Sequence, residues 1–382
     1  MRIAVDLTSL SGNLSGLERY AANITQSMIR LGRESKRYRR IKWILVVRNT
    51  VPEFVKELHE EMKGDIRVAM VKGGKLFINQ LKLPAVMWGI KADVYLFPAF
   101  PVPLLFGGKK GSRIFGLIAD TAVFDVPETM KLRSRLLFGA GLKHTANVCG
   151  GIITISEFSE SRIKEHLNPL GKVVMAPCAA DDMICENISN NQSSKEVKEK
   201  YGLPDRYILA CSTLEPRKNT ALIAEAYGSL VKEMSDKELP PLVLAGRNGW
   251  KMKEEIEKIC GELGERVLVP GFIDDEDLSH LYAHADIFVD ASVYEGFDMP
   301  PLEAMKCNVK KIILSDIPVH REVFGDSVRY FKSKDASALA ACIMECVGND
   351  DTSYVQKKHA VLEKYSWGKS AEIILDELIC KK

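Results

Sequence analysis

The sequence predicts an α/β protein with two domains, each built on a parallel sheet. Its 382 residues exceed the usual size of a single domain, about 100–200 residues. Short apolar runs alternate with amphipathic stretches, as they do where helices join the strands of a parallel sheet. One polar stretch, residues 181–200, interrupts this alternation and separates two blocks of similar size. We therefore expect a hinge near Asn187–Ser194.

The expected strands are short runs rich in β-branched and aliphatic residues. In chain order they are Ile3–Leu7, Ile41–Val47, Arg113–Ile118, Gly151–Ile155, Tyr207–Cys211, Leu242–Ala245, Ile287–Val289 and Val309–Leu314. Most of the expected helices lie between these runs and show apolar residues at helical spacing. They are Gly16–Leu31, Lys131–Thr145, Glu157–His166, Asn219–Glu233, Lys251–Cys260 and Asp335–Val347. Two doubly wound domains of this kind are expected to bind a ligand in a cleft, where the carboxyl ends of their strands face each other.

The composition excludes several classes of protein. Residues AVILMFWYC make up 46% and DEKR 27%, as in ordinary globular proteins. The 53 Lys and Arg less the 51 Asp and Glu leave a net charge of +2, which argues against a general nucleic-acid binder. The nine cysteines are scattered and form no C-x-x-C motif, so we expect a reduced protein of the cytoplasm. The longest apolar stretch, Leu96–Phe106, is too short to span a bilayer.

The most informative segment is SVYEGFDMPPLEAM at residues 292–305. Its two prolines suit the first turn of a helix, where a missing N–H costs nothing. A glycine turn that leads into a helix N-terminus presents backbone N–H groups and a positive dipole end, which suit a phosphate. The carboxylates of Glu295 and Glu303 flank the turn and can accept hydrogen bonds from sugar hydroxyls. The pattern fits a nucleotide-sugar site, and a plain strand–helix turn with capping acids is the alternative.

This segment resembles the E-x7-E motif of retaining glycosyltransferases of family 4, which have the GT-B architecture of two Rossmann-like domains. Other stretches resemble the family in the same order along the chain. They are LTSLSGNLSGLERY at 7–20, TISEFS at 154–159, TLEPRKN at 213–219, GFIDDEDL at 271–278 and DIPVHREV at 316–323. Several spaced motifs in one order are more specific than any one of them. The chain is therefore identified as a member of this family, and it resembles the mannosyltransferase members.

The resemblance implies an N-terminal acceptor-binding domain over residues 1–187 and a C-terminal nucleotide-sugar-binding domain over 188–365. Residues 366–382 are expected to form a helix that packs back on the N-terminal domain. The implied activity is the transfer, with retention, of a hexose to a hydroxyl of a growing glycan or lipid-linked oligosaccharide. The expected donor is GDP-mannose. No divalent metal or other cofactor is expected, because members of this family usually work without one.

The resemblance also gives roles to single residues. Lys218 is expected to neutralise the donor diphosphate. A second cation is sought in Arg217 or Arg247, because Ser212 stands where the commoner pattern has an arginine. Gly16 is expected to let the backbone of the N-terminal domain approach the diphosphate, where a side chain would block it.

Glu303 is expected to hold the donor ribose, and Glu295 and Asp120 are expected to act at the reacting centre. The other donor-binding candidates are Asp275, Gly296, Phe297, Asp298 and Met299. Of these, Asp275 could read the base, because a carboxylate can accept two parallel hydrogen bonds from guanine but not from uracil. A solvated, acidic helix start is the alternative for Asp275.

Two departures from the family pattern bear on activity. Ala119 stands where many members have a histidine, so a catalytic histidine is not carried over. Asp298 stands where many have glycine, and an acid beside a diphosphate is unfavourable unless it turns toward sugar hydroxyls. Two alternatives therefore stay open. One is a GT-B subunit that binds without turnover, and the other is a rhamnosyl- or glucosyltransferase that uses a dTDP- or UDP-sugar.

A membrane contact at the inner face of the bilayer is a further alternative. Residues 30–42, RLGRESKRYRRIK, carry seven Lys or Arg and one Glu. Such a run is typical of a solvated helix end, but it would also be attracted to an anionic membrane by roughly 1 kcal/mol per basic residue. Residues 95–106, YLFPAFPVPLLF, could form an apolar lip for a lipid-linked acceptor or a buried strand and loop.

Overall fold

The computed structural model divides the chain into two compact units. Unit 1 comprises Met1–Cys178 and Ser366–Lys382, and unit 2 comprises Ala179–Tyr365. The division falls after Cys178, earlier in the chain than the boundary expected after residue 187. Half of the expected hinge, Asn187–Ser194, lies outside the described residues, and its other half begins a helix over Asn191–Tyr201. The structure describes the chain apart from residues 11, 13, 63, 75–80, 182–190, 235–237, 248, 250, 251, 349–352, 381 and 382.

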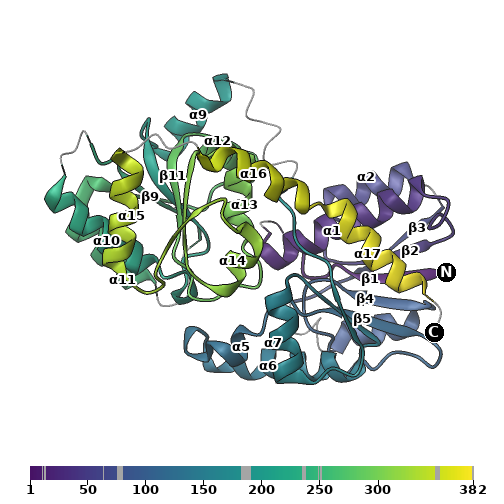
Figure 1. The fold of residues 1–382 in the computed structure, drawn as a ribbon. Coiled ribbons are helices and arrows are strands. Elements are labelled where there is room, and N and C mark those ends of the chain that lie inside the picture. Colours follow the sequence, from purple (N-terminus) through teal and green to yellow (C-terminus); the bar gives the residue numbers. More distant parts are fainter. Residues whose placement is uncertain are drawn as a thin grey trace. The chain divides into compact units, whose positions relative to one another are not determined.

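Unit 1 contains a seven-stranded sheet in the order β3-β2-β1-β4-β5-β6-β7, and every neighbouring pair is parallel. Its strands are β1 (Arg2–Asp6), β2 (Lys42–Arg48), β3 (Ile66–Val71), β4 (Val94–Phe97), β5 (Arg113–Leu117), β6 (Gly151–Thr154) and β7 (Lys172–Met175). Parallel neighbours require crossover connections, and all of them except the one between β4 and β5 carry helices here (Figure 1). These are α1 (Gly16–Glu34), α2 (Glu53–Glu61), α4 (Leu83–Gly89), α5 (Ala122–Asp125), α6 (Leu132–Val148) and α7 (Glu157–Leu167).

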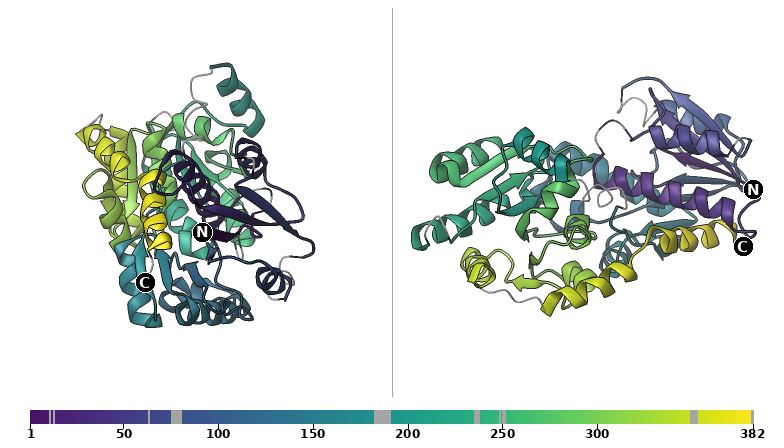
Figure 2. Two further views of the ribbon diagram at one scale, coloured as in Figure 1. Left: turned by 90° about the vertical axis from the view of Figure 1, so that its right-hand side faces the viewer. Right: turned by 90° about the horizontal axis from the view of Figure 1, so that it is seen from above.

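The C-terminal helix α17 (Trp367–Ile379) belongs to unit 1, although the chain enters it from unit 2. It packs along α1 (Figure 2). The ring of Trp367 meets that of Tyr20 edge-on, with 5.6 Å between the ring centroids. Leu375 and Leu378 are fully buried. Helix α17 thus completes the core of unit 1.

Helices α4, α6 and α7 share one core cluster with the strands of unit 1. Most of residues 95–106 belong to this core, because Tyr95, Phe97, Val102 and Phe106 are almost fully buried. The buried strand and loop is therefore the correct description of this stretch, apart from its two exposed leucines at 104 and 105. By length and hydropathy, none of the helices in the described ranges could span a bilayer.

Unit 2 contains a six-stranded sheet in the order β10-β9-β8-β11-β12-β13, again with parallel pairs throughout. Its strands are β8 (Tyr207–Cys211), β9 (Leu242–Ala245), β10 (Val267–Gly271), β11 (Ala285–Asp290), β12 (Lys311–Ser315) and β13 (Arg329–Phe331). Its helices are α9 (Asn191–Tyr201), α10 (Thr220–Glu233), α11 (Lys253–Leu263), α12 (Leu278–Ala283), α13 (Met299–Lys306), α14 (Pro318–Phe324), α15 (Ala336–Gly348) and α16 (Ser353–Lys364).

The chain order reverses between β8 and β11 of unit 2. From β8 the sheet extends through β9 to β10 on one side, and from β11 it extends through β12 to β13 on the other. The loops that leave β8 and β11 at their carboxyl ends therefore diverge and open a crevice. Ligands of doubly wound sheets bind at such a switch point.

Candidate active site

A buried lysine joins the two loops at the switch point of unit 2. Lys218 ends a short 3-10 turn after β8, Pro216–Lys218, and its side chain is only 9% exposed. Its ammonium lies 2.8 Å from Asp298 Oδ1, 2.9 Å from Glu295 Oε1 and 3.2 Å from Asp290 Oδ2. It donates hydrogen bonds to Asp290 and Asp298, whereas its contact with Glu295 Oε1 is an ion pair without hydrogen-bond geometry.

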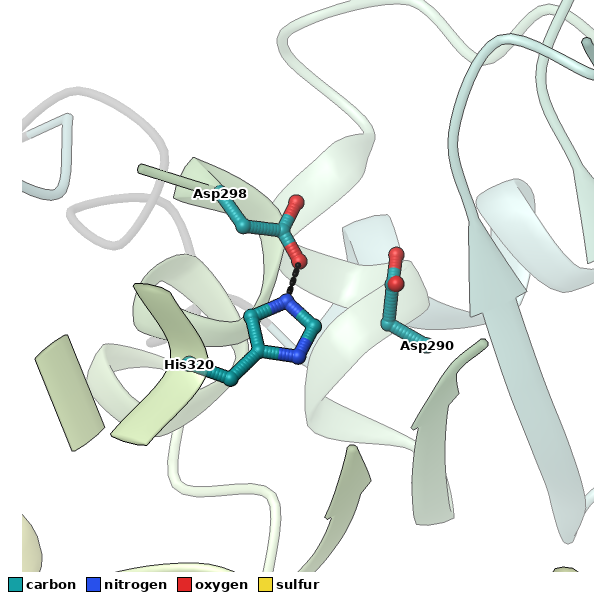
Figure 3. Close-up of side chains that lie close together, drawn as sticks. All are labelled: Asp290, Asp298 and His320. Atoms are coloured by element: carbon teal, nitrogen blue, oxygen red, sulfur yellow. Dashed lines mark hydrogen bonds and ion pairs between the residues drawn. The ribbon is translucent and has the colours of Figure 1, made fainter. Parts of the chain in front are cut away.

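The carboxylate of Asp298 binds a second cationic group on its other oxygen. His320 of α14 is fully buried, and its Nε2 lies 3.1 Å from Asp298 Oδ2 (Figure 3). The Nδ1 of the same ring lies 2.8 Å from the backbone oxygen of Ser315. A carboxylate and a carbonyl are both acceptors, so both ring nitrogens are placed to donate. This geometry suits a protonated imidazolium.

The pKa shifts agree with this distribution of charge. Burial alone would lower the pKa of Lys218 and His320, but the neighbouring carboxylates outweigh it and raise both pKa values. Burial would raise the pKa of Asp298, but Lys218 and His320 hold it below the ordinary value. Burial and the nearby charge of Asp298 raise the pKa of Asp290. In this site the carboxylates therefore stabilise the charged forms of Lys218 and His320, and these two cations stabilise the ionised form of Asp298.

Arg217 adds a third cation and is itself tightly held. Its guanidinium lies 2.6 Å from Glu295 Oε2 and 2.9 Å from Glu215 Oε1, and it also donates to the backbone oxygen of Tyr294 at 2.9 Å. Both oxygens of Glu295 thus face a cation, Arg217 on one and Lys218 on the other. We call Arg217, Lys218, Asp290, Glu295, Asp298 and His320 the charge cluster.

The backbone at Asp298 explains why glycine is common at this position. Asp298 caps α13 with φ 78° and ψ 86°, in a left-handed region that costs an L-residue roughly 1–2 kcal/mol. Glycine adopts it without that cost. Here the strain is offset by two bonds to the side chain, from Lys218 and His320. The carboxylate is therefore directed at protein groups, and its predicted contact with the donor sugar stays a prediction.

The first turn of α13 has few backbone N–H donors, because two of its residues are prolines. Pro300 and Pro301 occupy the first turn and carry no N–H. Met299 is the residue of this first turn that keeps a backbone N–H. The side chain of Phe297 is buried and packs edge-on against Tyr365, with 5.1 Å between the ring centroids. Any contact of Phe297 with a donor would thus involve its backbone.

Arg247 follows β9 and differs from Arg217 in the contacts of its guanidinium. Its guanidinium stacks on the ring of Phe272 at 4.5 Å from the centroid, and its buried Nη2 has no hydrogen-bond partner among the residues that the structure describes. It makes no ion pair within the described part of the chain. Gly246 holds this loop close to the loop after β8, because a Cβ there would lie 1.7 Å from the backbone oxygen of Ser212.

The remaining candidates in unit 2 flank the charge cluster. Glu303, in α13, is buried and accepts a hydrogen bond from Tyr282 Oη at 2.9 Å. Asp275 is exposed before α12. Its neighbours Asp274 and Asp277 both accept from Lys200 Nζ, at 2.8 and 2.7 Å. This acidic run is therefore partly neutralised within unit 2.

Gly16 and Asp120 lie in unit 1. Gly16 is the first residue of α1, and the capping box of Ser15 and Glu18 fixes this helix start. Asp120 follows β5, and its Oδ1 accepts a hydrogen bond from the backbone N–H of Ala122 at 2.9 Å. Their roles toward a donor held by unit 2 stay predictions.

Asp290, Asp298 and His320 each offer an atom within 4.8 Å of the others, as metal ligands would. However, the Lys218 ammonium is within 3.2 Å of both carboxylates, so a cation already stands between them. A divalent ion would have to displace that ammonium and the proton on His320 Nε2. These residues therefore fit a lysine better than a metal.

Asp290 and His320 were not among the predicted site residues. Asp290 is the last residue of β11 and His320 lies within α14, and neither is in the E-x7-E segment. Two signals were present in the sequence: His320 stands in the DIPVHREV stretch at 316–323, and the acid at residue 298 needs partners if it is buried.

The comparisons with known proteins place the chain in a family. Residues 193–365 match the model described as Glycosyl transferases group 1. Over 287 residues the chain is 31% identical to O-antigen chain mannosyltransferase B of Escherichia coli, covering 72% of this chain and 71% of that protein. The chain therefore belongs to the group 1 glycosyl transferases. Serotype-specific mannosyltransferase WbdA of Escherichia coli is 33% identical over 188 residues, 48% of this chain but only 23% of that longer protein.

Solved structures establish the fold. Sucrose-phosphate synthase from Thermosynechococcus elongatus matches with a TM-score of 0.72 over 98% of both chains, at 16% identity. WaaG, a glycosyltransferase involved in lipopolysaccharide biosynthesis, matches with a TM-score of 0.70 over 99% of this chain and 100% of the WaaG chain, at 12% identity. The predicted GT-B fold, with two parallel-sheet α/β units, is confirmed.

The pairing of His320 with Asp298 should make stability depend on pH. A His320→Gln variant keeps a donor but loses the charge. Because the folded pKa of His320 is raised, its contribution is fully present below the ordinary pKa of about 6.5 and is lost as pH rises through the folded value. We expect the variant to be less stable by about 1.5–3 kcal/mol at low pH, with a gap that narrows as pH rises.

Thermal unfolding across pH checks this expectation. The matched control is His359→Gln, because His359 lies on α16 of the same unit with its side chain 79% exposed. If the difference in stability between the wild type and His320→Gln is constant or widens with pH, His320 is neutral in the folded protein.

Proposed function

We propose that the chain is a retaining glycosyltransferase that moves mannose from GDP-mannose to a hydroxyl of a growing glycan or lipid-linked oligosaccharide. One observation carries the proposal. The switch point of unit 2 gathers Lys218 and Glu295 in one buried cluster, with Glu303 buried on the adjoining helix. The similarity to O-antigen chain mannosyltransferase B supports mannose as the sugar.

The diphosphate needs a cation that can still bind an anion. The Lys218 ammonium already forms ion pairs with three carboxylates, and Arg217 is held by two carboxylates and a carbonyl. Among the described residues, the buried Nη2 of Arg247 meets no acceptor, and its loop packs on the loop before Lys218. We therefore assign the second diphosphate cation to Arg247. Lys218 would exchange its longest contact, that to Asp290, for a phosphate oxygen.

Glu295 would act by electrostatic stabilisation rather than as a nucleophile. Both its oxygens are paired with cations, which makes it a poor attacking group. A fixed carboxylate beside the anomeric carbon would stabilise the positive charge that develops there as the diphosphate leaves. Such a preorganised charge stabilises the transition state more than the ground state.

No metal is needed in this scheme. The leaving diphosphate would be met by Arg247, Lys218 and the backbone N–H groups before α13. The acceptor, if lipid-linked, would bring the enzyme to the inner face of a membrane.

The base preference tests the donor. In a thermal-shift panel of GDP, UDP, dTDP and ADP, we expect GDP to stabilise the protein most, by about 2.7 kcal/mol at a hundredfold excess over Kd. The order should be the same with and without EDTA. The preference should weaken in Asp275→Ala if that carboxylate reads guanine. A larger shift with UDP or dTDP would contradict mannose from GDP-mannose and favour a glucosyl or rhamnosyl donor.

The assignment of Arg247 predicts a difference between two arginines. Arg247→Ala should weaken GDP binding in calorimetry by about 10–100-fold, since charge-assisted bonds contribute roughly 1.5–3 kcal/mol, with little change in stability. Arg217→Ala should instead lower the thermal midpoint, because Glu215 and Glu295 lose their common partner. The control is Arg206→Ala, at the amino end of β8 and paired with Asp286. Unchanged GDP affinity in Arg247→Ala would remove the assignment.

Glu295 should matter for turnover more than for binding. Glu295→Gln should lower kcat at least about 100-fold, near 2.7 kcal/mol, with a small change in donor KM. Glu215→Gln is the control, because Glu215 shares Arg217 but is more exposed. The product should keep the anomeric configuration of the donor by NMR. If the wild-type protein binds GDP but neither transfers the sugar nor hydrolyses the donor, it is a binding subunit.

A further inference from the structure

Apolar side chains gather on one exposed surface of unit 1. Leu132, Leu136 and Leu137, in the first two turns of α6, have exposed fractions of 66%, 64% and 43%. Leu104 and Leu105, in the loop after β4, have exposed fractions of 39% and 54%. Leu104 and Leu137 line the same pocket, so helix and loop form one surface. We call these five residues the leucine surface.

These leucines are not required by the core of unit 1. Residues 131–137 are all exposed, whereas α6 enters the core further along, through Leu142 and Ala146. Single exposed leucines are common, but several on one surface mark a binding site or a membrane contact.

The charged residues on the helix start and loop of the leucine surface are all positive. Lys131, Arg133 and Arg135 alternate with its leucines, and Lys109 and Lys110 follow its loop. Residues 98–112 and 131–147 contain no Asp or Glu, and the one acid lining the pocket of Leu104 and Leu137 among the described residues is the buried Asp6. Arg133 and Arg135 form no ion pair with any residue that the structure describes. The surface thus combines exposed apolar area with the positive charge of Arg133 and Arg135.

The basic segment 30–42 differs from the leucine surface because part of its charge is paired and its apolar residues are not exposed. Arg33 pairs with Glu61, Arg37 with Asp376, and Lys42 with Asp65. Its large apolar members are not exposed, and Tyr38 and Ile41 are buried. This segment therefore fits the solvated helix end better than a membrane contact.

We propose that the leucine surface docks unit 1 on an anionic lipid bilayer. Leucines would enter the interface between headgroups and acyl chains, while the flanking lysines and arginines would contact lipid phosphates. A bilayer is favoured over a second copy of the chain, because a two-fold contact would bring the same positive charges together. The inference goes beyond the proposed activity and does not depend on which donor is used.

Vesicle flotation with the full-length protein tests the proposal. The wild type should float with vesicles of equal parts phosphatidylcholine and phosphatidylglycerol, but weakly with phosphatidylcholine alone, and added salt should reduce binding. Leu132→Ser with Leu136→Ser should lower the partition coefficient at least about tenfold, because each exposed leucine contributes apolar area. Arg133→Glu with Arg135→Glu should lower it by about the same factor on anionic vesicles.

Two matched variants serve as controls. Leu170→Ser removes a leucine that is 79% exposed beside the far end of α6, and Arg39→Glu with Arg40→Glu reverses charges in segment 30–42. Both should float like the wild type, and all variants should keep the wild-type thermal midpoint.

Three outcomes would overturn the proposal. The wild type could fail to bind either vesicle. The Arg39 and Arg40 variant could lose binding while the leucine variant keeps it, which would assign the contact to segment 30–42. Finally, light scattering could show an oligomer that the leucine variant dissociates, which would make the surface a contact between copies of the chain.

Discussion

The arrangement of unit 2 around its switch point depends on one ion pair system, the ammonium of Lys218 among Asp290, Glu295 and Asp298. Each carboxylate comes from β11 or the loop that leaves it, whereas the lysine comes from the loop after β8. Without the cation, three carboxylates would face one another in a buried space, at a cost that proteins avoid. The ammonium therefore fixes the position of both loops.

His320 extends this system into the next strand–helix connection. It follows β12 and reaches Asp298 from the side opposite to Lys218. One carboxylate thus ties together the connections that leave three adjacent strands, β8, β11 and β12. The left-handed backbone at Asp298 is held in place by the same two bonds. The loop between β11 and α13 is in this way held in one conformation by protein groups alone. If it binds the proposed donor, this order reduces the ordering cost of binding.

The sequence was sufficient to predict the two α/β units and most of the strands that lie deep in each sheet. Tyr207–Cys211 and Leu242–Ala245 agree with β8 and β9 to the residue. The strands that were not predicted, β3, β7, β10 and β13, are of three to six residues, and all four lie at sheet edges. Most of strand β4 belongs to residues 95–106, for which a buried strand and loop was one of two alternatives. Edge strands lack the continuous apolar run of a central strand, and β10 contains a proline and a glycine, which weaken the strand pattern.

The sequence predicted which segments form the candidate site but not which of their charged side chains pair with each other. The motifs placed Lys218, Glu295 and Asp298 in one region, and the structure brings their charged atoms into contact. The sequence could not show that Arg217 is held by carboxylates while Arg247 is not, because this depends on how two loops meet at Gly246. Asp290 and His320 were missed for the same reason, since contacts across neighbouring strands leave no spacing pattern in the chain.

The return of α17 to unit 1 has a consequence for synthesis. The ribosome makes the strands of unit 1 first and then all of unit 2, and only afterwards the helix that packs along α1. At roughly 5–20 residues per second, unit 1 would wait tens of seconds for that helix. During this interval the faces of Tyr20 and Tyr38 that later meet Trp367 and Asp376 lack these partners. Unit 1 is therefore completed only after unit 2 has been translated, and a nascent chain would leave the surface of α1 that α17 covers exposed to chaperones until α17 is made.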